Sequence, residues 1–111
     1  MSATTTIPII VTPEAAAFVR EKGWEQELER MLDHTLQTVP DLLRVRVVKE
    51  TDYTCGGEYI NIEANRAPVA DPVADRTNVE WLQWRTETFP LEVSWHFALT
   101  SYYEDHDNHG R

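Results

Sequence analysis

The clearest pattern along this chain is a helical spacing of apolar side chains that begins at Trp24 and ends at Val39. Within this segment the apolar positions recur mostly three or four residues apart, and most charged residues occupy the opposite side. Such a period aligns one face of an α-helix. The face consists of Trp24, Leu28, Met31, Leu32, Thr35, Leu36 and Val39. Because Pro40 cannot continue a helix, we expect an amphipathic helix that ends before it and packs on a core.

A shorter helix is predicted just upstream of this segment. Thr12 can cap its start, Pro13 suits the first helical position, and Glu14 suits the positive end of the helix dipole. The alanines at 15–17 follow as strong helix formers. Gly23 is expected to separate the two helices, since glycine weakens a helix interior.

Two later segments alternate between apolar and polar residues, which is the period of a half-buried strand. The first covers 43–49 and the second covers 60–64. Gly56 and Gly57 lie between them in a segment that favours a turn. The simplest arrangement of the two segments is an antiparallel hairpin.

A connector and a short helix are predicted next. Residues 66–78 contain two closely spaced prolines, which disfavour both a helix and a central strand. Thr77 and Glu80 have the spacing of a capping box, so we expect a helix over 78–88. A strand is the alternative there, because apolar and polar residues also alternate at the start of that range.

The last element is predicted to be a long strand. Every second residue from Leu91 to Leu99 is apolar, and Trp95 falls on the apolar side together with Phe97. This period of two predicts that Trp95 points towards the core, while Glu92 and His96 lie on the polar side.

Together these elements predict a single α+β domain over residues 1–111, with flexible ends at 1–8 and 104–111. A chain of 111 residues has room for one modest hydrophobic core. We expect two layers, in which N-terminal helices pack on a small antiparallel sheet, and the element order α-α-β-β-α-β.

The chain is strongly acidic, with a formal net charge of −9 at pH 7. Residues 1–50 contribute −2 of this charge and residues 51–111 contribute −7. A nucleic-acid or anionic-membrane surface would require a basic face, and only Arg44, Arg46 and Lys49 cluster. We therefore expect no nucleic-acid and no membrane partner, whereas long-range attraction favours a basic protein partner.

Cysteine usage and the chain start bear on location and cofactors. Cys55 is the only cysteine, which excludes an internal disulfide and a cysteine-rich metal site. The first residues lack the basic and apolar regions of a secretory signal, so we expect a cytoplasmic protein.

Residues 8–18 and 55–59 are loosely similar to the opening and first-cysteine regions of the A-type iron–sulfur carriers. Those carriers also require a cysteine pair near the C-terminus, which this chain lacks, so we expect no cofactor.

Sequence motifs for catalysis are missing. The chain has no phosphate-binding glycine loop and no serine in a nucleophile-elbow pattern. A pocket formed by His96, Glu92 and Tyr59 is the alternative hypothesis, because a histidine beside a carboxylate can act as an acid–base pair.

The tail at 104–109 is rich in histidine and carboxylate donors for a divalent ion. A flexible tail must be ordered when it binds, so we expect it to stay solvated without metal.

Small size, acidity, aromatic content and the missing catalytic motifs favour a non-enzymatic protein that binds a protein partner. Such a protein would be an acidic bacterial accessory factor, for example the neutralising partner of a basic effector or toxin. The residues expected to bind the partner are Trp81, Trp84, Glu80, Glu87 and Glu92. A small enzyme or ligand-binding domain with the His96 pocket is the second hypothesis. The third is a homodimer or homo-oligomeric structural protein that associates through the last strand, if that strand lies at a sheet edge.

Overall fold

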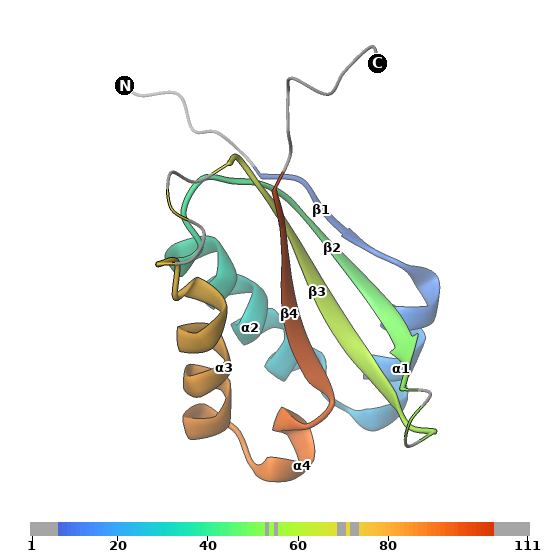
Figure 1. Ribbon diagram of the computed structural model, residues 1–111. Coiled ribbons are helices and arrows are strands. Elements are labelled where there is room, and N and C mark those ends of the chain that lie inside the picture. Colours follow the sequence, from blue (N-terminus) through green and yellow to red (C-terminus); the bar gives the residue numbers. More distant parts are fainter. Residues whose placement is uncertain (1–6, 53, 55, 69–70, 72–73, 104–111) are drawn as a thin grey trace.

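The computed structural model describes residues 7–52, 54, 56–68, 71 and 74–103. The elements along the chain (Figure 1) are β1 (Ile9–Val11), α1 (Pro13–Lys22), α2 (Glu25–Thr38), β2 (Leu42–Thr51), β3 (Glu58–Arg66), α3 (Thr77–Thr88), α4 (Leu91–Ser94) and β4 (Phe97–Tyr103). The predicted α+β class is confirmed. Strand β1 and the short helix α4 are additions to the predicted order.

The four strands form one mixed sheet in the order β1-β2-β3-β4. The predicted hairpin is confirmed, because β2 and β3 pair antiparallel, with Val47 opposite Ile62. The expectation of a wholly antiparallel sheet is wrong, because β1 pairs parallel with β2, and β3 pairs parallel with β4. Each parallel pair is joined by two helices, since a tight turn cannot connect parallel strands.

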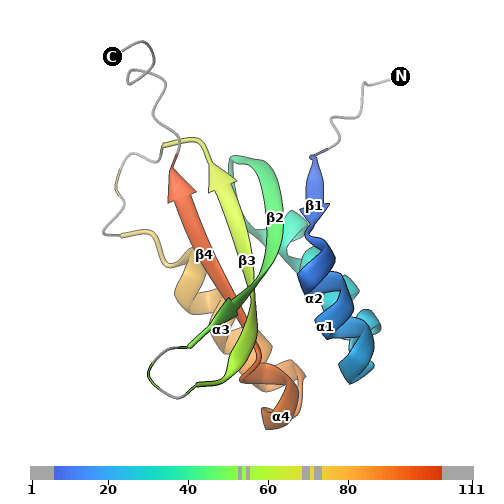
Figure 2. The ribbon, with the colours of Figure 1, turned by 90° about the vertical axis from the view of Figure 1, so that its right-hand side faces the viewer.

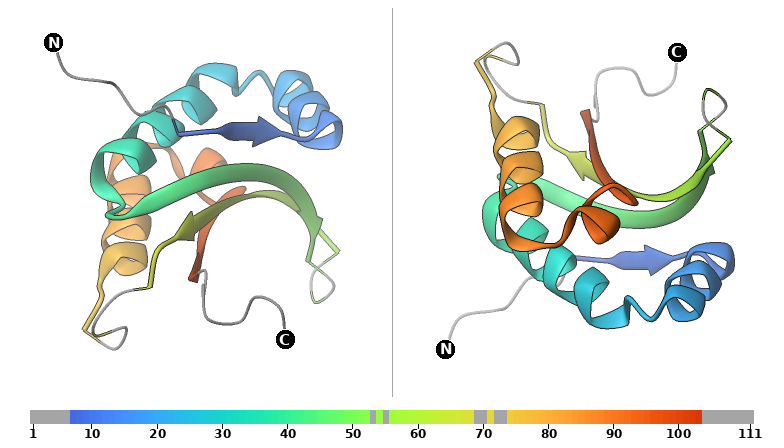
Figure 3. Two further views of the ribbon diagram at one scale, coloured as in Figure 1. Left: turned by 90° about the horizontal axis from the view of Figure 1, so that it is seen from above. Right: turned by 90° about the horizontal axis from the view of Figure 1, so that it is seen from below.

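The described helices gather on one face of the sheet, and no described helix or strand covers the other face (Figures 1 and 3). The covered face carries the apolar side chains of the strands, such as Val47, Ile62 and Leu99, which are buried. On the open face, Arg46 lies 3.3 Å from Glu63. The hydrophobic core therefore lies between one face of the sheet and the helices, and helices from both halves of the chain contribute to it.

The two N-terminal helices begin and end close to the predicted positions. The Thr12 side chain accepts a hydrogen bond from the N–H of Ala15, and Gly23 has a φ of 76°, which terminates α1. In α2 the predicted stripe faces the core, with Met31 and Thr35 fully buried. Leu36 is the exception, because its side chain remains exposed at the margin of the stripe.

The third helix confirms the helix predicted over 78–88, but its start differs from the predicted capping box. Thr77 is the first helical residue rather than the cap. Asp75 accepts hydrogen bonds from the backbone N–H and the hydroxyl of Thr77. The helix start is therefore fixed by a carboxylate in the preceding loop, which also contacts the sheet.

The predicted strand from Leu91 onward begins six residues late. Residues 91–94 form α4, in which the N–H of Ser94 donates to the oxygen of Pro90 at 2.9 Å. The Ser94 hydroxyl contacts the oxygens of Arg85 and Phe89 at 3.1 and 3.2 Å and so satisfies carbonyls at the end of α3. These contacts outweigh the period of two, and the strand starts only at Phe97.

Some predictions fall outside the described residues. The terminal ranges 1–6 and 104–111, with the metal-donor tail, are among them, and so is Cys55. In the described part of the chain, no helix is long and apolar enough to cross a bilayer.

Candidate interaction surface

The most exposed large apolar side chains lie on and beside α4. Trp95 is 74% exposed and Leu91 is 63% exposed, whereas Val93 and Ser94 between them are buried. This split follows from the helical turn, which directs Leu91 and Trp95 to the same side because they are four residues apart. The indole predicted to point into the core therefore lies on the surface.

Two depressions lie beside Trp95. The larger, of about 380 Å³, is lined by Leu91, Glu92, Trp95 and His96. The smaller, of about 190 Å³, is lined by Asp52, Gly57, Glu58, Tyr59, Trp95 and His96. Trp95 and His96 border both depressions, so the two adjoin the same pair of side chains. We call this area the Trp95 surface.

His96 anchors the Trp95 surface to the core. Its Nδ1 lies 2.7 Å from the backbone oxygen of Glu92. A carbonyl oxygen can only accept, so Nδ1 carries the proton in this hydrogen bond. The imidazole also packs against Trp24 and Phe18, with ring centroids 5.1 and 6.3 Å away. His96 therefore holds the turn between α4 and β4 in place.

The rim of the Trp95 surface is acidic. Glu92 borders one depression, and Asp52 and Glu58 border the other. Lys49 contacts Glu58 at 3.0 Å and offsets part of this charge. Burial raises the pKa of the Tyr59 hydroxyl, and the nearby carboxylates of Glu50 and Asp52 raise this pKa further. Burial and the two nearby carboxylates thus both disfavour the phenolate.

The residues predicted to bind a partner do not form one surface. Trp81 is 1% exposed and belongs to the core, where its Nε1 donates to the Thr35 hydroxyl at 3.0 Å. Glu87 is exposed on α3, and Glu92 lies on the Trp95 surface. Trp81 is therefore a correction to the predicted set, because its indole has no accessible face.

Trp84 and Glu80 border a separate cleft between α2 and α3. The Trp84 ring stacks on the His34 ring, with centroids 3.7 Å apart and planes inclined by 3°. The cleft has a volume of about 250 Å³ and is lined by His34, Thr38, Thr77, Glu80, Trp81 and Trp84. Burial lowers the pKa of His34, which favours the neutral imidazole in this stack.

The three residues of the alternative pocket do come together around Trp95. His96 and Glu92 share one depression, and His96 and Tyr59 share the other. The depression beside Glu92 is wide open to solvent, and Nδ1 of His96 is occupied by a backbone carbonyl. The arrangement is an open surface with a polar rim rather than an enclosed cavity.

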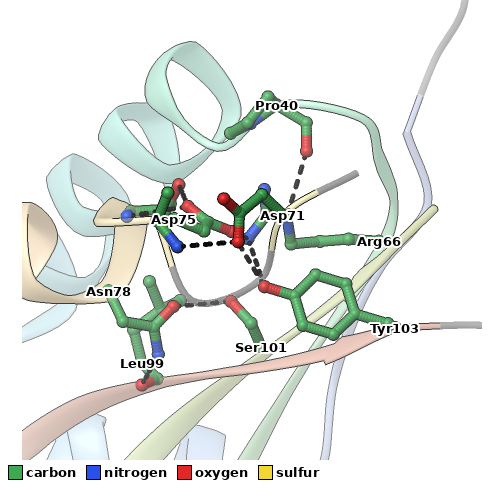
Figure 4. A network of polar contacts seen from close by, with 10 residues as sticks. Pro40, Arg66, Asp71, Asp75, Asn78, Leu99, Ser101 and Tyr103 are labelled. Atoms are coloured by element: carbon green, nitrogen blue, oxygen red, sulfur yellow. Dashed lines mark hydrogen bonds and ion pairs between the residues drawn. The ribbon is translucent and has the colours of Figure 1, made fainter. Parts of the chain in front are cut away.

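A polar network holds the loop before α3 against the far end of the sheet (Figure 4). The Arg66 guanidinium is buried and donates to Asp75 at 2.7 Å and to the oxygen of Pro40 at 3.1 Å. The Tyr103 hydroxyl donates to the same Asp75 carboxylate at 2.8 Å. These hydrogen bonds, and above all those from Thr77, hold the pKa of Asp75 well below its usual range. The network joins β3, β4 and α3 and is structural in character.

The last strand does lie at a sheet edge, as the self-association hypothesis requires, but helix α3 covers part of that edge. Arg85 donates to the backbone oxygen of Phe97, and Asn78 donates to that of Leu99 at 2.9 Å. Two outward-facing carbonyls of β4 are thus already occupied. Covering an edge in this way is a common protection against strand pairing with another chain.

Sequence reasoning missed Leu91 and Trp95 as surface residues. Two signals point to them: Pro90 favours a helix start immediately before Leu91, and the four-residue spacing of Leu91 and Trp95 fits a helical turn. The alternating pattern through Leu99 is the stronger signal and conceals both.

Comparisons with known protein families, with curated proteins and with solved structures found no match for this chain. Among the described residues, no group of three or more metal-ligating side chains is close enough to hold an ion.

Proposed function

We propose that this protein is an acidic interaction module that binds a basic segment of a partner protein through the Trp95 surface. The observation that carries the proposal is the 74% exposure of Trp95 beside Leu91, in a region rimmed by carboxylates. An exposed indole and an exposed leucine on one side of a helical turn are costly to hydrate, and burial against a partner removes that cost.

The chemistry of the surface suits a partner segment that carries both apolar and cationic side chains. Tryptophan is enriched among the residues that dominate binding energy at protein interfaces. Its ring also attracts a lysine or arginine side chain placed over its face. Glu92 and Glu58 lie where they can pair with such cations at the rim. A basic effector or toxin is one class of partner with these properties, and its basic surface would be covered in the complex.

The support for a preorganised site comes from the way the Trp95 surface is held. His96 is packed on Trp24, and Ser94 ties α4 to the end of α3. A binding surface whose backbone is already ordered loses less entropy when a partner docks. The open shape of the larger depression favours a protein segment over an enclosed small molecule.

Site-specific photo-crosslinking tests the proposal. A photoreactive phenylalanine analogue at position 91 should capture a basic protein from a lysate of the organism that encodes the chain. The same analogue at position 79 is the control, because Val79 is exposed on α3 away from the Trp95 surface. The purified captured protein should bind the chain directly, and Trp95→Ala should abolish the product. Equal capture at both positions, or an acidic protein as the product, would contradict the proposal.

A further inference from the structure

Strand β1 forms the second edge of the sheet, and this edge is apolar and accessible. Ile9, Ile10 and Val11 are 37%, 55% and 37% exposed. Figure 2 looks towards this side of the sheet, and no described element lies beyond β1 at the level of the strand. Three adjacent exposed aliphatic residues on an edge strand are a recognised hazard for unintended pairing.

The backbone of β1 offers hydrogen-bonding groups on its outer side. The oxygen of Pro8 accepts from Val45 at 2.9 Å, and the N–H of Thr12 donates to Val47 at 3.0 Å. Residues 8, 10 and 12 therefore direct their backbone groups to β2, because these groups alternate along a strand. Ile9 and Val11 direct theirs outward, where β4 instead has carbonyls occupied by Asn78 and Arg85. The two edges therefore differ: α3 covers part of the β4 edge, whereas no described element pairs with the outer side of β1.

The charge distribution favours a second copy of the chain, rather than a basic partner, as the occupant of this edge. Residues 1–13 contain no acidic or basic side chain, although the whole chain has a net charge of −9. Two such chains repel one another wherever their acidic surfaces meet. The uncharged β1 edge belongs to residues 1–50, which carry only −2, so contact there keeps the more acidic halves apart. A basic partner would gain no ionic attraction at this edge.

We propose that two copies pair antiparallel through β1 about a twofold axis and form one continuous eight-stranded sheet. The outward N–H and C=O groups of Ile9 and Val11 determine the register between the two β1 strands. Ile9 of one copy lies opposite Val11 of the other, and each such pair exchanges two backbone hydrogen bonds. Ile10 lies opposite Ile10 of the second copy, with Cα atoms about 4.5 Å apart. The contact is isologous and closed, so it ends at a dimer.

The dimer is weak and concentration dependent. A pairing of three residues buries less than the ~1,000 Å² expected of a stable complex. Sedimentation of the full chain should show monomer at low concentration and a rising dimer fraction at high concentration. Ile9→Pro removes the outward N–H of each copy but no N–H that pairs with β2, and it should weaken the dimer by about tenfold or more. Val79→Lys, at another exposed apolar residue, serves as the control for general surface effects.

Disulfide trapping tests the register directly. In a Cys55→Ser background, Ile10→Cys should cross-link to itself under mild oxidation, because the predicted Cα separation permits a disulfide. Ile9→Cys should not, because each such cysteine faces Val11 of the other copy and lies more than ~7 Å from its equivalent. A mixture of the Ile9→Cys and Val11→Cys proteins should cross-link as a heterodimer, which confirms that both cysteines are reactive.

Three outcomes would overturn the inference. The first is equal self-cross-linking by Ile10→Cys and Ile9→Cys, which indicates random collision. The second is a constant monomer mass over the whole accessible concentration range. The third is a dimer that Trp95→Ala abolishes and Ile9→Pro leaves intact, which would move the contact to the Trp95 surface.

Discussion

At the scale of single residues, the free energy of unfolding should depend strongly on Asp75, because its carboxylate neutralises the buried Arg66 guanidinium. Arg66 is 1% exposed and lies 2.7 Å from Asp75. Asp75→Asn leaves a buried positive charge without its anion, which typically costs about 3 kcal/mol or more. We expect a loss of this order in the free energy of unfolding, measured in urea. Asp71→Asn is the matched control, because Asp71 is exposed and should change the stability by less than about 0.5 kcal/mol.

The same carboxylate predicts a dependence of stability on pH. Hydrogen bonds from Thr77, then from Tyr103 and Arg66, hold the pKa of Asp75 below its unfolded value of 3.8. The contribution of Asp75 is thus fully present above that value and is lost as pH falls through the folded pKa. The difference in melting temperature between the wild type and Asp75→Asn should shrink as pH falls from 6 to 2. A difference that stays constant over this range would contradict the assigned role.

At the scale of elements, helix α4 decides which side chains form the surface. The Ser94 hydroxyl is buried and contacts the oxygens of Arg85 and Phe89. Ser94→Ala leaves these carbonyls without that donor and should cost about 1–2 kcal/mol in urea unfolding. Thr86→Ala removes an exposed hydroxyl that donates to Leu82 and should have a much smaller effect. Equal losses for the two variants would show that Ser94 does not hold the turn.

Local sequence signals predicted the longer elements and missed the short ones. Helix α2 lies between Gly23 and Pro40, as predicted, and its apolar stripe faces the core. These signals are reliable because they depend only on residues within or next to the helix. Strand β1 has only three residues and depends on pairing with β2, so it is too short to show a periodic pattern in the sequence. The spacing of residues 91–94 fits both the period of a strand and that of a helix. Hydrogen bonds from the Ser94 hydroxyl to Arg85 and Phe89 stabilise the helix. The position of Trp95 follows from that helix, which is why the surface was not predictable from spacing alone.

At the scale of the whole molecule, the surplus of acidic residues should govern the rate of association with a basic partner. Electrostatic attraction between exposed charges is screened over about 8 Å at physiological salt. The on-rate for the captured partner should therefore fall steeply towards ~0.5 M salt, while the off-rate changes less. Stopped-flow or surface-based kinetics would measure both rates.

Charge reversal tests where this attraction is directed. Glu92→Lys should slow association more than Glu29→Lys, which makes the same charge change on an exposed position of α2. Both variants should keep the wild-type fold by circular dichroism, since both side chains are exposed. Equal effects of the two variants would mean that net charge alone, rather than the rim of the Trp95 surface, steers the partner.

The affinity of the captured partner for the Trp95→Ala variant tests the central claim most directly. A central tryptophan at an interface typically contributes 2 kcal/mol or more, so we expect the dissociation constant to rise by about 30-fold. Stability should change by less than about 0.5 kcal/mol, because the indole is 74% exposed. Val79→Ala, also at an exposed apolar residue, should leave both quantities unchanged. Unaltered affinity of a folded Trp95→Ala protein would contradict the assignment of the Trp95 surface as the binding site.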